Sequence, residues 1–224
     1  MALGVARPDV YISADVETDG PVPGPYSMLS FALSVVGTYD GRRLVRASAD
    51  DPEASFYREL RPISESFDRE ALAVNGLDRD ALYERGDDPT LAMLEAVGWI
   101  ERVSDGHRPV LVAYPVAFDW SFLYWYFQQF AGSSPFGHSS CLDIRTFFHA
   151  AAGTVFDLSG KSSMPEDVLP NREHTHNALD DAIEQGELFA NLFDANARAR
   201  SALGQLDEHD PTPLWIKRRM VRIS

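Results

Sequence analysis

The chain has 224 residues, a length that single α/β domains commonly reach, and 45% of its residues are apolar, which is enough to form a hydrophobic core. Its formal net charge of −14 argues against loose clamping of long duplex nucleic acid, because an acidic surface repels a polyanion. No apolar run approaches the roughly 20 residues that cross a bilayer, so we expect no association with a membrane.

Cysteine usage and the first residues bear on location. The only cysteine, Cys141, excludes an internal disulfide and is typical of a reducing compartment. The start MALGVARPDV lacks the charged and apolar regions of a secretory signal. We therefore expect a cytoplasmic protein. From the length of the chain we expect a single domain over 1–224, with a core at about 8–195 and a C-terminal extension at 196–224.

The first predicted strand lies in the stretch VYISADVETDG, residues 10–20. Side chains alternate along a strand, so Asp15 and Glu17 point to the same face, with Cα atoms roughly 6.6 Å apart. Two carboxylates arranged in this way indicate either a wet strand face or the start of a metal site.

Further elements follow in a regular order. The Pro/Gly segment 21–25 predicts a loop, and two more strands are predicted at 27–37 and 54–62. Helices are predicted at 64–76 and 89–106, with a buried parallel strand at 109–116. This order predicts an α/β fold in which an antiparallel meander and parallel strands form one mixed sheet flanked by helices.

An acid follows the buried strand directly. Asp119 lies in the stretch AFDWSFL, at the start of an apolar helix predicted over 118–130. The carboxyl end of a strand is where α/β proteins place ligand-binding groups, but an aspartate at a helix start also serves as an N-cap. Position alone leaves both interpretations open.

The segment 141–150 is ambiguous, and 153–175 is predicted to be a loop with a short helix. The last helix, predicted over 177–193, carries the adjacent acids Asp180 and Asp181. Asp180 lies on a polar stripe that is predicted to face water, with Glu184, Glu187 and Asn191. Asp181 instead heads the line of Leu188 and Leu192, where a buried carboxylate needs a partner such as a cation.

His176 lies five residues before Asp181, with His174 close to it. A histidine at a helix entry is commonly structural or solvated. Beside a cluster of acids it can instead act as a base, because it titrates near neutrality.

Read in order, DVET, AFDWSFL and HNALDDA resemble the DEDDh family of 3′-to-5′ exonucleases, which have a ribonuclease H-like fold. The resemblance spans about residues 10–193. It implies that two Mg²⁺ or Mn²⁺ ions are held by four acids and that a histidine is the base; the counterparts are Asp15, Glu17, Asp119, Asp181 and His176.

The resemblance also implies a substrate, the 3′ end of single-stranded or short nucleic acid. By this resemblance Thr18 would contact the 3′ end. Tyr26 and the aromatic helix at 118–130, Phe118 among its residues, could stack on bases, but core packing is the expected role for most of these aromatic residues. One departure is that Tyr114 and Pro115 stand where family members commonly carry His-Asn.

Two other classes compete with the exonuclease. A catalytically silent module that binds nucleic acid or protein would have lost at least one ligand, and none is lost here. A structural calcium protein leaves the histidine unexplained and would need an EF-hand spacing that the sequence lacks. The tail TPLWIKRRMVRIS at 212–224 fits folding back on the body, substrate contact or a homodimer equally well.

Overall fold

A mixed sheet forms the centre of the fold. The computed structural model describes residues 7–48, 51–172 and 175–202. Within these residues the strands of the sheet are β1 (Asp9–Thr18), β2 (Met28–Tyr39), β3 (Leu44–Arg46), β4 (Ser55–Glu59), β5 (Arg108–Ala113) and β6 (Cys141–Asp143).

The order of the strands is β3-β2-β1-β5-β6, and β4 pairs with β2 beside β3. The pairs β1–β2, β2–β3 and β2–β4 are antiparallel, whereas β1–β5 and β5–β6 are parallel. The predicted mixed sheet is thereby confirmed. The parallel pair brings the carboxyl end of β5 toward that of β1, which is where the candidate ligands lie.

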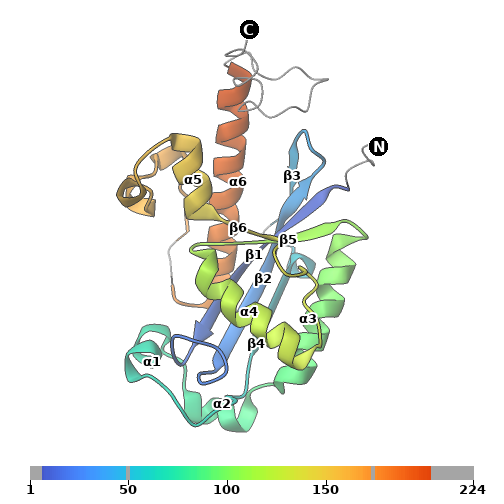
Figure 1. Cartoon of the computed structure of the whole chain (residues 1–224), viewed down its shortest axis with the longest axis vertical. Coiled ribbons are helices and arrows are strands. Elements are labelled where there is room, and N and C mark those ends of the chain that lie inside the picture. The colour runs from blue at the N-terminus through green and yellow to red at the C-terminus, as the bar shows by residue number, and fades with distance from the viewer. Residues whose placement is uncertain (1–6, 49–50, 173–174, 203–224) are drawn as a thin grey trace.

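Helices cover both faces of this sheet (Figure 1). They are α1 (Arg69–Asn75), α2 (Arg79–Arg85), α3 (Pro89–Ser104), α4 (Val116–Phe130), α5 (Ile144–Ala152) and α6 (Ala178–Ala202). None of these helices is long and apolar enough to cross a membrane.

The alternation along β1 divides the hydrophobic core between the two faces. Val10, Ile12, Ala14 and Val16 are buried in one cluster with side chains of α3 and α4. Tyr11 belongs to the opposite cluster, with side chains of α5 and α6. Each fully buried large apolar side chain contributes about 1.5–3 kcal/mol, so both helix layers are held firmly against the strand that carries the acids.

Several local predictions needed correction. The helix predicted from Ser64 begins only after Asp68, whose carboxylate accepts a hydrogen bond from Glu70 N. The helix predicted near Asp119 begins earlier, with Pro115 at the N-cap position, so Asp119 lies in its first turn and is not the cap. The ambiguous segment at 141–150 contains β6 and then α5. The sequence patterns predicted neither β3 nor α2, both of which are short.

Candidate active site

Asp15 and Glu17 lie near the end of β1, on the face opposite the α3 and α4 core. Both are half-buried, whereas their neighbours Ala14 and Val16 are buried in that core. The predicted alternation is therefore present, and it directs both carboxylates toward the side that α6 covers. A register irregularity between Glu17 and Thr18 ends the regular pairing with β2 at this point.

Asp119 reaches the same place from α4. Strand β1 pairs with β5 only as far as Ser13, and beyond this pair the backbone N–H of Val16 donates to Asp119 Oδ1 at 3.1 Å. The side chain is 4% exposed. One of its oxygens therefore fixes it to the strand that carries Asp15 and Glu17.

The start of α6 supplies the remaining acid and the histidine. Asn177 caps the helix, since its Oδ1 accepts from the N–H groups of Leu179 and Asp180. Immediately before the cap, Thr175 N donates to Asp181 Oδ1 at 2.9 Å. The Asp181 carboxylate thereby ties the entry segment to the first turn, and this contact helps to place the exposed side chain of His176 beside it.

The backbone of His176 adopts φ 57°, in the left-handed region. Residues other than glycine enter this region rarely and at some energetic cost, which the surrounding structure must offset. A glycine would fit this conformation without strain.

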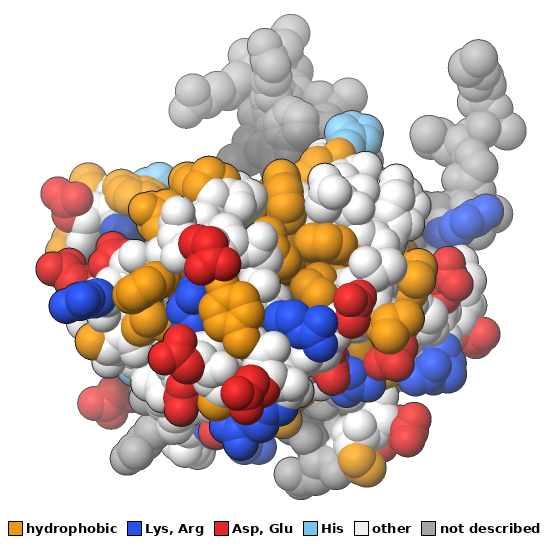
Figure 2. Space-filling model, turned by 90° about the horizontal axis from the view of Figure 1, so that it is seen from below, with side chains coloured by type: hydrophobic (Ala, Val, Ile, Leu, Met, Phe, Trp, Pro, Cys, Tyr) orange, Lys and Arg blue, Asp and Glu red, His pale blue; other side chains and the backbone are white. Residues whose placement is uncertain are grey.

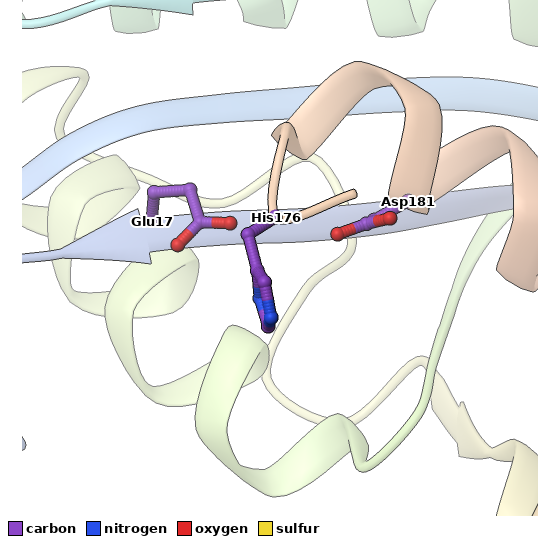
Figure 3. A group of neighbouring side chains, drawn as sticks. All are labelled: Glu17, His176 and Asp181. Carbon is purple, nitrogen blue, oxygen red and sulfur yellow. The ribbon is translucent and has the colours of Figure 1, made fainter. Parts of the chain in front are cut away.

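Glu17, His176 and Asp181 converge on one point. One potential ligand atom from each lies within 4.8 Å of the others. Figure 3 shows the two carboxylates approaching from β1 and α6, on either side of the His176 ring. These residues are far apart in the sequence, and the packing of α6 on β1 brings them together.

The pKa values of three of the acids are raised, because the carboxylates are buried close to one another. Burial, followed by the charges of Asp119, Glu17 and Asp181, raises the pKa of Asp15 well above its ordinary value. Burial and the Asp181 charge raise the pKa of Glu17 to about 7, and burial raises that of Asp119 to about 8. The carboxylates therefore oppose one another's ionisation.

This donor set fits divalent cations. Carboxylate oxygens are the ligands that hard ions such as Mg²⁺ and Mn²⁺ prefer. A cation between the acids would also reverse the mutual repulsion that raises their pKa values.

The three residues predicted to contact substrate have different surroundings. Phe118 is 38% exposed, next to Asp119, with its ring against Phe122. Thr18 is buried, and its hydroxyl donates to Gly20 O. The ring of Tyr26 covers Gly20, where a Cβ would lie only 2.0 Å from a ring carbon. Among the three, Phe118 presents the freest surface.

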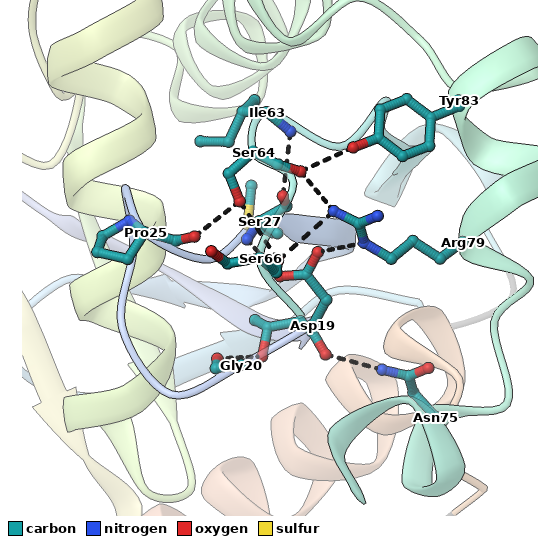
Figure 4. Close-up of polar contacts among 12 residues, drawn as sticks. Asp19, Gly20, Pro25, Ser27, Ile63, Ser64, Ser66, Asn75, Arg79 and Tyr83 are labelled. Atoms are coloured by element: carbon teal, nitrogen blue, oxygen red, sulfur yellow. Dashed lines mark hydrogen bonds and ion pairs between the residues drawn. The ribbon is translucent and has the colours of Figure 1, made fainter. Parts of the chain in front are cut away.

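A buried ion pair that the sequence analysis missed anchors the loop that follows Glu17 and Thr18 (Figure 4). Asp19 is fully buried and accepts from Ser27 N at 2.5 Å and from Arg79 Nε at 2.7 Å. Arg79 also donates to Ser64 O, and Asn75 Nδ2 donates to Thr18 O at 3.0 Å. The segment that leaves the acidic strand is therefore fixed to α1 and α2.

The polar stripe predicted on α6 is only partly correct. Asp180 is exposed as predicted, but Glu184 is 4% exposed and its Oε2 lies 2.6 Å from Lys161 Nζ. The Tyr114 hydroxyl, in turn, accepts from Lys161 N at 3.0 Å. Lys161 comes from the long connection before α6, whose path over the helix a periodicity argument cannot predict.

Comparison with curated proteins identifies two kinds of relative. The chain is 36% identical to the 3′-5′ DNA exonuclease Cap18 of Escherichia coli over 182 residues, which cover 81% of this chain and 90% of that protein. It is 31% identical to ribonuclease T of Shewanella oneidensis over 126 residues, about half of each protein (54% and 55%). No family model matches the chain.

Solved structures share the fold at low sequence identity. The nuclease domain of 3′hExo, a DEDDh family member, bound to rAMP superposes with a TM-score of 0.60 at 12% identity, covering 86% of this chain and 94% of that one. E. coli Exonuclease I in complex with a dT13 oligonucleotide gives a TM-score of 0.58 at 13% identity, covering 87% of this chain and 42% of that one.

Proposed function

The chain belongs to the DEDDh family of 3′-to-5′ exonucleases, and we propose that it removes nucleotides from the 3′ end of single-stranded or short DNA with the help of two divalent metal ions. Cleavage of a phosphodiester by a site of carboxylates requires cations, because the acids alone would repel the substrate. The observation that carries the proposal is the convergence of Glu17, His176 and Asp181 beside Asp15 and Asp119.

The residues that would hold the metal ions are Asp15, Glu17, Asp119 and Asp181. When bound, Mg²⁺ or Mn²⁺ ions would stabilise the charge that develops on the attacking and leaving oxygens of an in-line displacement. Oδ1 of Asp119 accepts a hydrogen bond from Val16 N, so Oδ2 is the oxygen proposed to bind a metal ion. Three separate elements, β1, α4 and α6, thus supply the ligands from a rigid frame.

His176 is the proposed general base. Its side chain is exposed, so a water molecule can reach it, and one of its ring nitrogens lies within 4.8 Å of carboxylate oxygens of Glu17 and Asp181. The histidine would take the proton from the attacking water.

DNA is the proposed substrate because the relative with the higher sequence identity, 36% over 81% of this chain, is named a DNA exonuclease, whereas a ribonuclease T that matches over a similar share, 80%, is 29% identical. Phe118 is the proposed stacking surface for a base, and Thr18 and Tyr26 the proposed wall around the terminal nucleotide. Figure 2 shows basic side chains interspersed with acidic and apolar ones, with no continuous basic area on the part of this face that the structure describes. This surface suits a short substrate better than a long duplex.

Further properties complete the proposal. The single domain proposed over 1–224 is supported, within the described residues, by one sheet with helices on both of its faces. A cytoplasmic location is supported by the lone cysteine, Cys141. The tail at 212–224 lies outside the described part of the chain. Light scattering of the full chain and of a chain ending at 202 would test whether the protein is a homodimer and whether the tail is needed for it.

The experiment for the proposed function uses a 5′-labelled single-stranded DNA and an RNA of the same sequence, each with Mg²⁺, Mn²⁺ or EDTA. The expected result is a ladder that shortens one nucleotide at a time with either metal, disappears in EDTA and forms faster on DNA. Faster degradation of the RNA would show that RNA, and not DNA, is the preferred substrate. Intact substrates in every metal, with equal binding by wild type and Asp15→Ala, would instead favour a silent binding module.

A further inference from the structure

A buried amide lies against the central acid of the site. Gln185 is 2% exposed and lies one turn beyond Asp181 on α6. Its Nε2 donates to Asp15 Oδ1 at 2.7 Å, and its Oε1 accepts from the backbone N–H of Tyr114 at 2.7 Å. One side chain therefore connects β1, α6 and the end of β5.

The chemistry of these partners fixes which way the amide faces. A backbone N–H can only donate, so the carbonyl oxygen of Gln185 must face Tyr114. The amide NH₂ then faces Asp15, whose carboxylate oxygen accepts its hydrogen bond. Exchanging the two amide atoms would bring two donors together at Tyr114, and that contact would be lost.

Close packing of α6 on the sheet brings the amide within reach. At Gly186, the next residue, an added Cβ would lie 3.2 Å from Ser13 Cβ and 3.2 Å from Val36 Cγ2. These distances are tighter than ordinary carbon contacts, so the glycine lets the helix approach β1 and β2 closely. The short separation allows the Gln185 side chain to span from the helix to both Asp15 and Tyr114.

We propose that Gln185 is a positioning residue for the metal site. By holding Oδ1 of Asp15 in a hydrogen bond, it fixes the carboxylate plane and leaves the other oxygen directed at the ions. Residues that orient metal ligands in this way typically affect metal affinity or activity about 10–100-fold when changed. The proposal rests on the proposed function, since it concerns the same ions.

Gln185→Met is the informative variant, because it keeps the length and volume of the side chain while removing both the donor and the acceptor. Leu188→Met is its matched control, placing the same residue at a fully buried position of the same helix, in the apolar cluster that α5 and α6 form with the sheet. Mn²⁺ binding is measured by calorimetry without substrate, and kcat and KM are measured on a short single-stranded DNA.

We expect Gln185→Met to bind Mn²⁺ about 10–100-fold more weakly and to turn over more slowly at a fixed Mn²⁺ concentration, with KM for DNA little changed. Leu188→Met should match wild type in both respects. In an Asp15→Ala background, Gln185→Met should cause no further loss of Mn²⁺ binding, because the group it positions is gone. Additive losses in that background would overturn the proposal.

Gln185→Asn covers the case in which the methionine variant does not fold. It keeps a polar amide but is one methylene too short to reach both partners, so it should show the same weakening of Mn²⁺ binding. Wild-type Mn²⁺ affinity and kcat in either folded variant would overturn the inference alone. A wild-type protein that neither binds Mn²⁺ nor degrades DNA would overturn the proposed function and the inference with it.

Discussion

Removal of the Arg79 guanidinium should destabilise the protein far more than removal of an exposed guanidinium. Arg79 Nε lies 2.7 Å from Asp19 Oδ2, with the two side chains 7% and 0% exposed. Arg79→Met leaves a buried carboxylate without its cation, a change that typically costs about 3–5 kcal/mol. Arg46→Met is the matched control, because its pair with Asp194 is similarly short at 2.6 Å but 41% and 35% exposed, and it should cost less than about 1 kcal/mol.

The assay is equilibrium unfolding in urea with EDTA present. At about 2 kcal/mol per molar urea, Arg79→Met should lower the midpoint by roughly 1.5–2.5 M. Adding Asp19→Asn to Arg79→Met should recover stability, because asparagine can still accept from Ser27 N and no buried charge is left uncompensated. Equal losses for Arg79→Met and Arg46→Met, or a double variant less stable than Arg79→Met, would refute this reasoning.

Three further predictions concern the site itself. His176→Ala should lower kcat by about 10²–10⁴-fold with little change in KM, as measured by initial rates on a short DNA, and an unchanged kcat would remove it as the base. Asp181→Asn should reduce hydrolysis at least about 100-fold, whereas Asp180→Asn should leave it nearly intact because Asp180 is exposed; equal losses in the same assay would contradict the helix-face argument. In EDTA the folded protein should hold protons that the unfolded chain has lost, because the pKa of Glu17 is raised from 4.5 to about 7 and that of Asp119 from 3.8 to about 8. The free energy of unfolding should therefore fall as the pH rises from about 4 to 8, and Mg²⁺ should restore it at pH 8; a urea midpoint that rises with pH in EDTA would count against this.

The side-chain periods of single strands and helices predicted much of the site. The two-residue period of β1 placed Asp15 and Glu17 on one face, and the helical period separated exposed Asp180 from buried Asp181. These predictions succeeded because each depends only on the geometry of one element. The start of α4 was predicted less well, because Pro115 at the N-cap position moved the first turn ahead of Asp119.

Contacts between distant segments could not be predicted in the same way. Asp19 and Arg79 are 60 residues apart, and Lys161 reaches Glu184 from an irregular connection. Gln185 did carry a signal, since it lies four residues after Asp181 on the same helix line as the buried leucines. Its partners became clear only when the close approach of α6 to β1 was known.

Two-metal hydrolysis by the four acids is tested most directly by locating Mn²⁺ by anomalous diffraction in crystals grown with a nucleoside 5′-monophosphate. We expect two ions about 3.5–4 Å apart, with Asp15 between them, Glu17 and Asp181 on one ion, and the phosphate contacting both. An acidic cluster without bound Mn²⁺ at saturating concentration, or a single ion bound away from Asp15, would contradict two-metal hydrolysis by these acids.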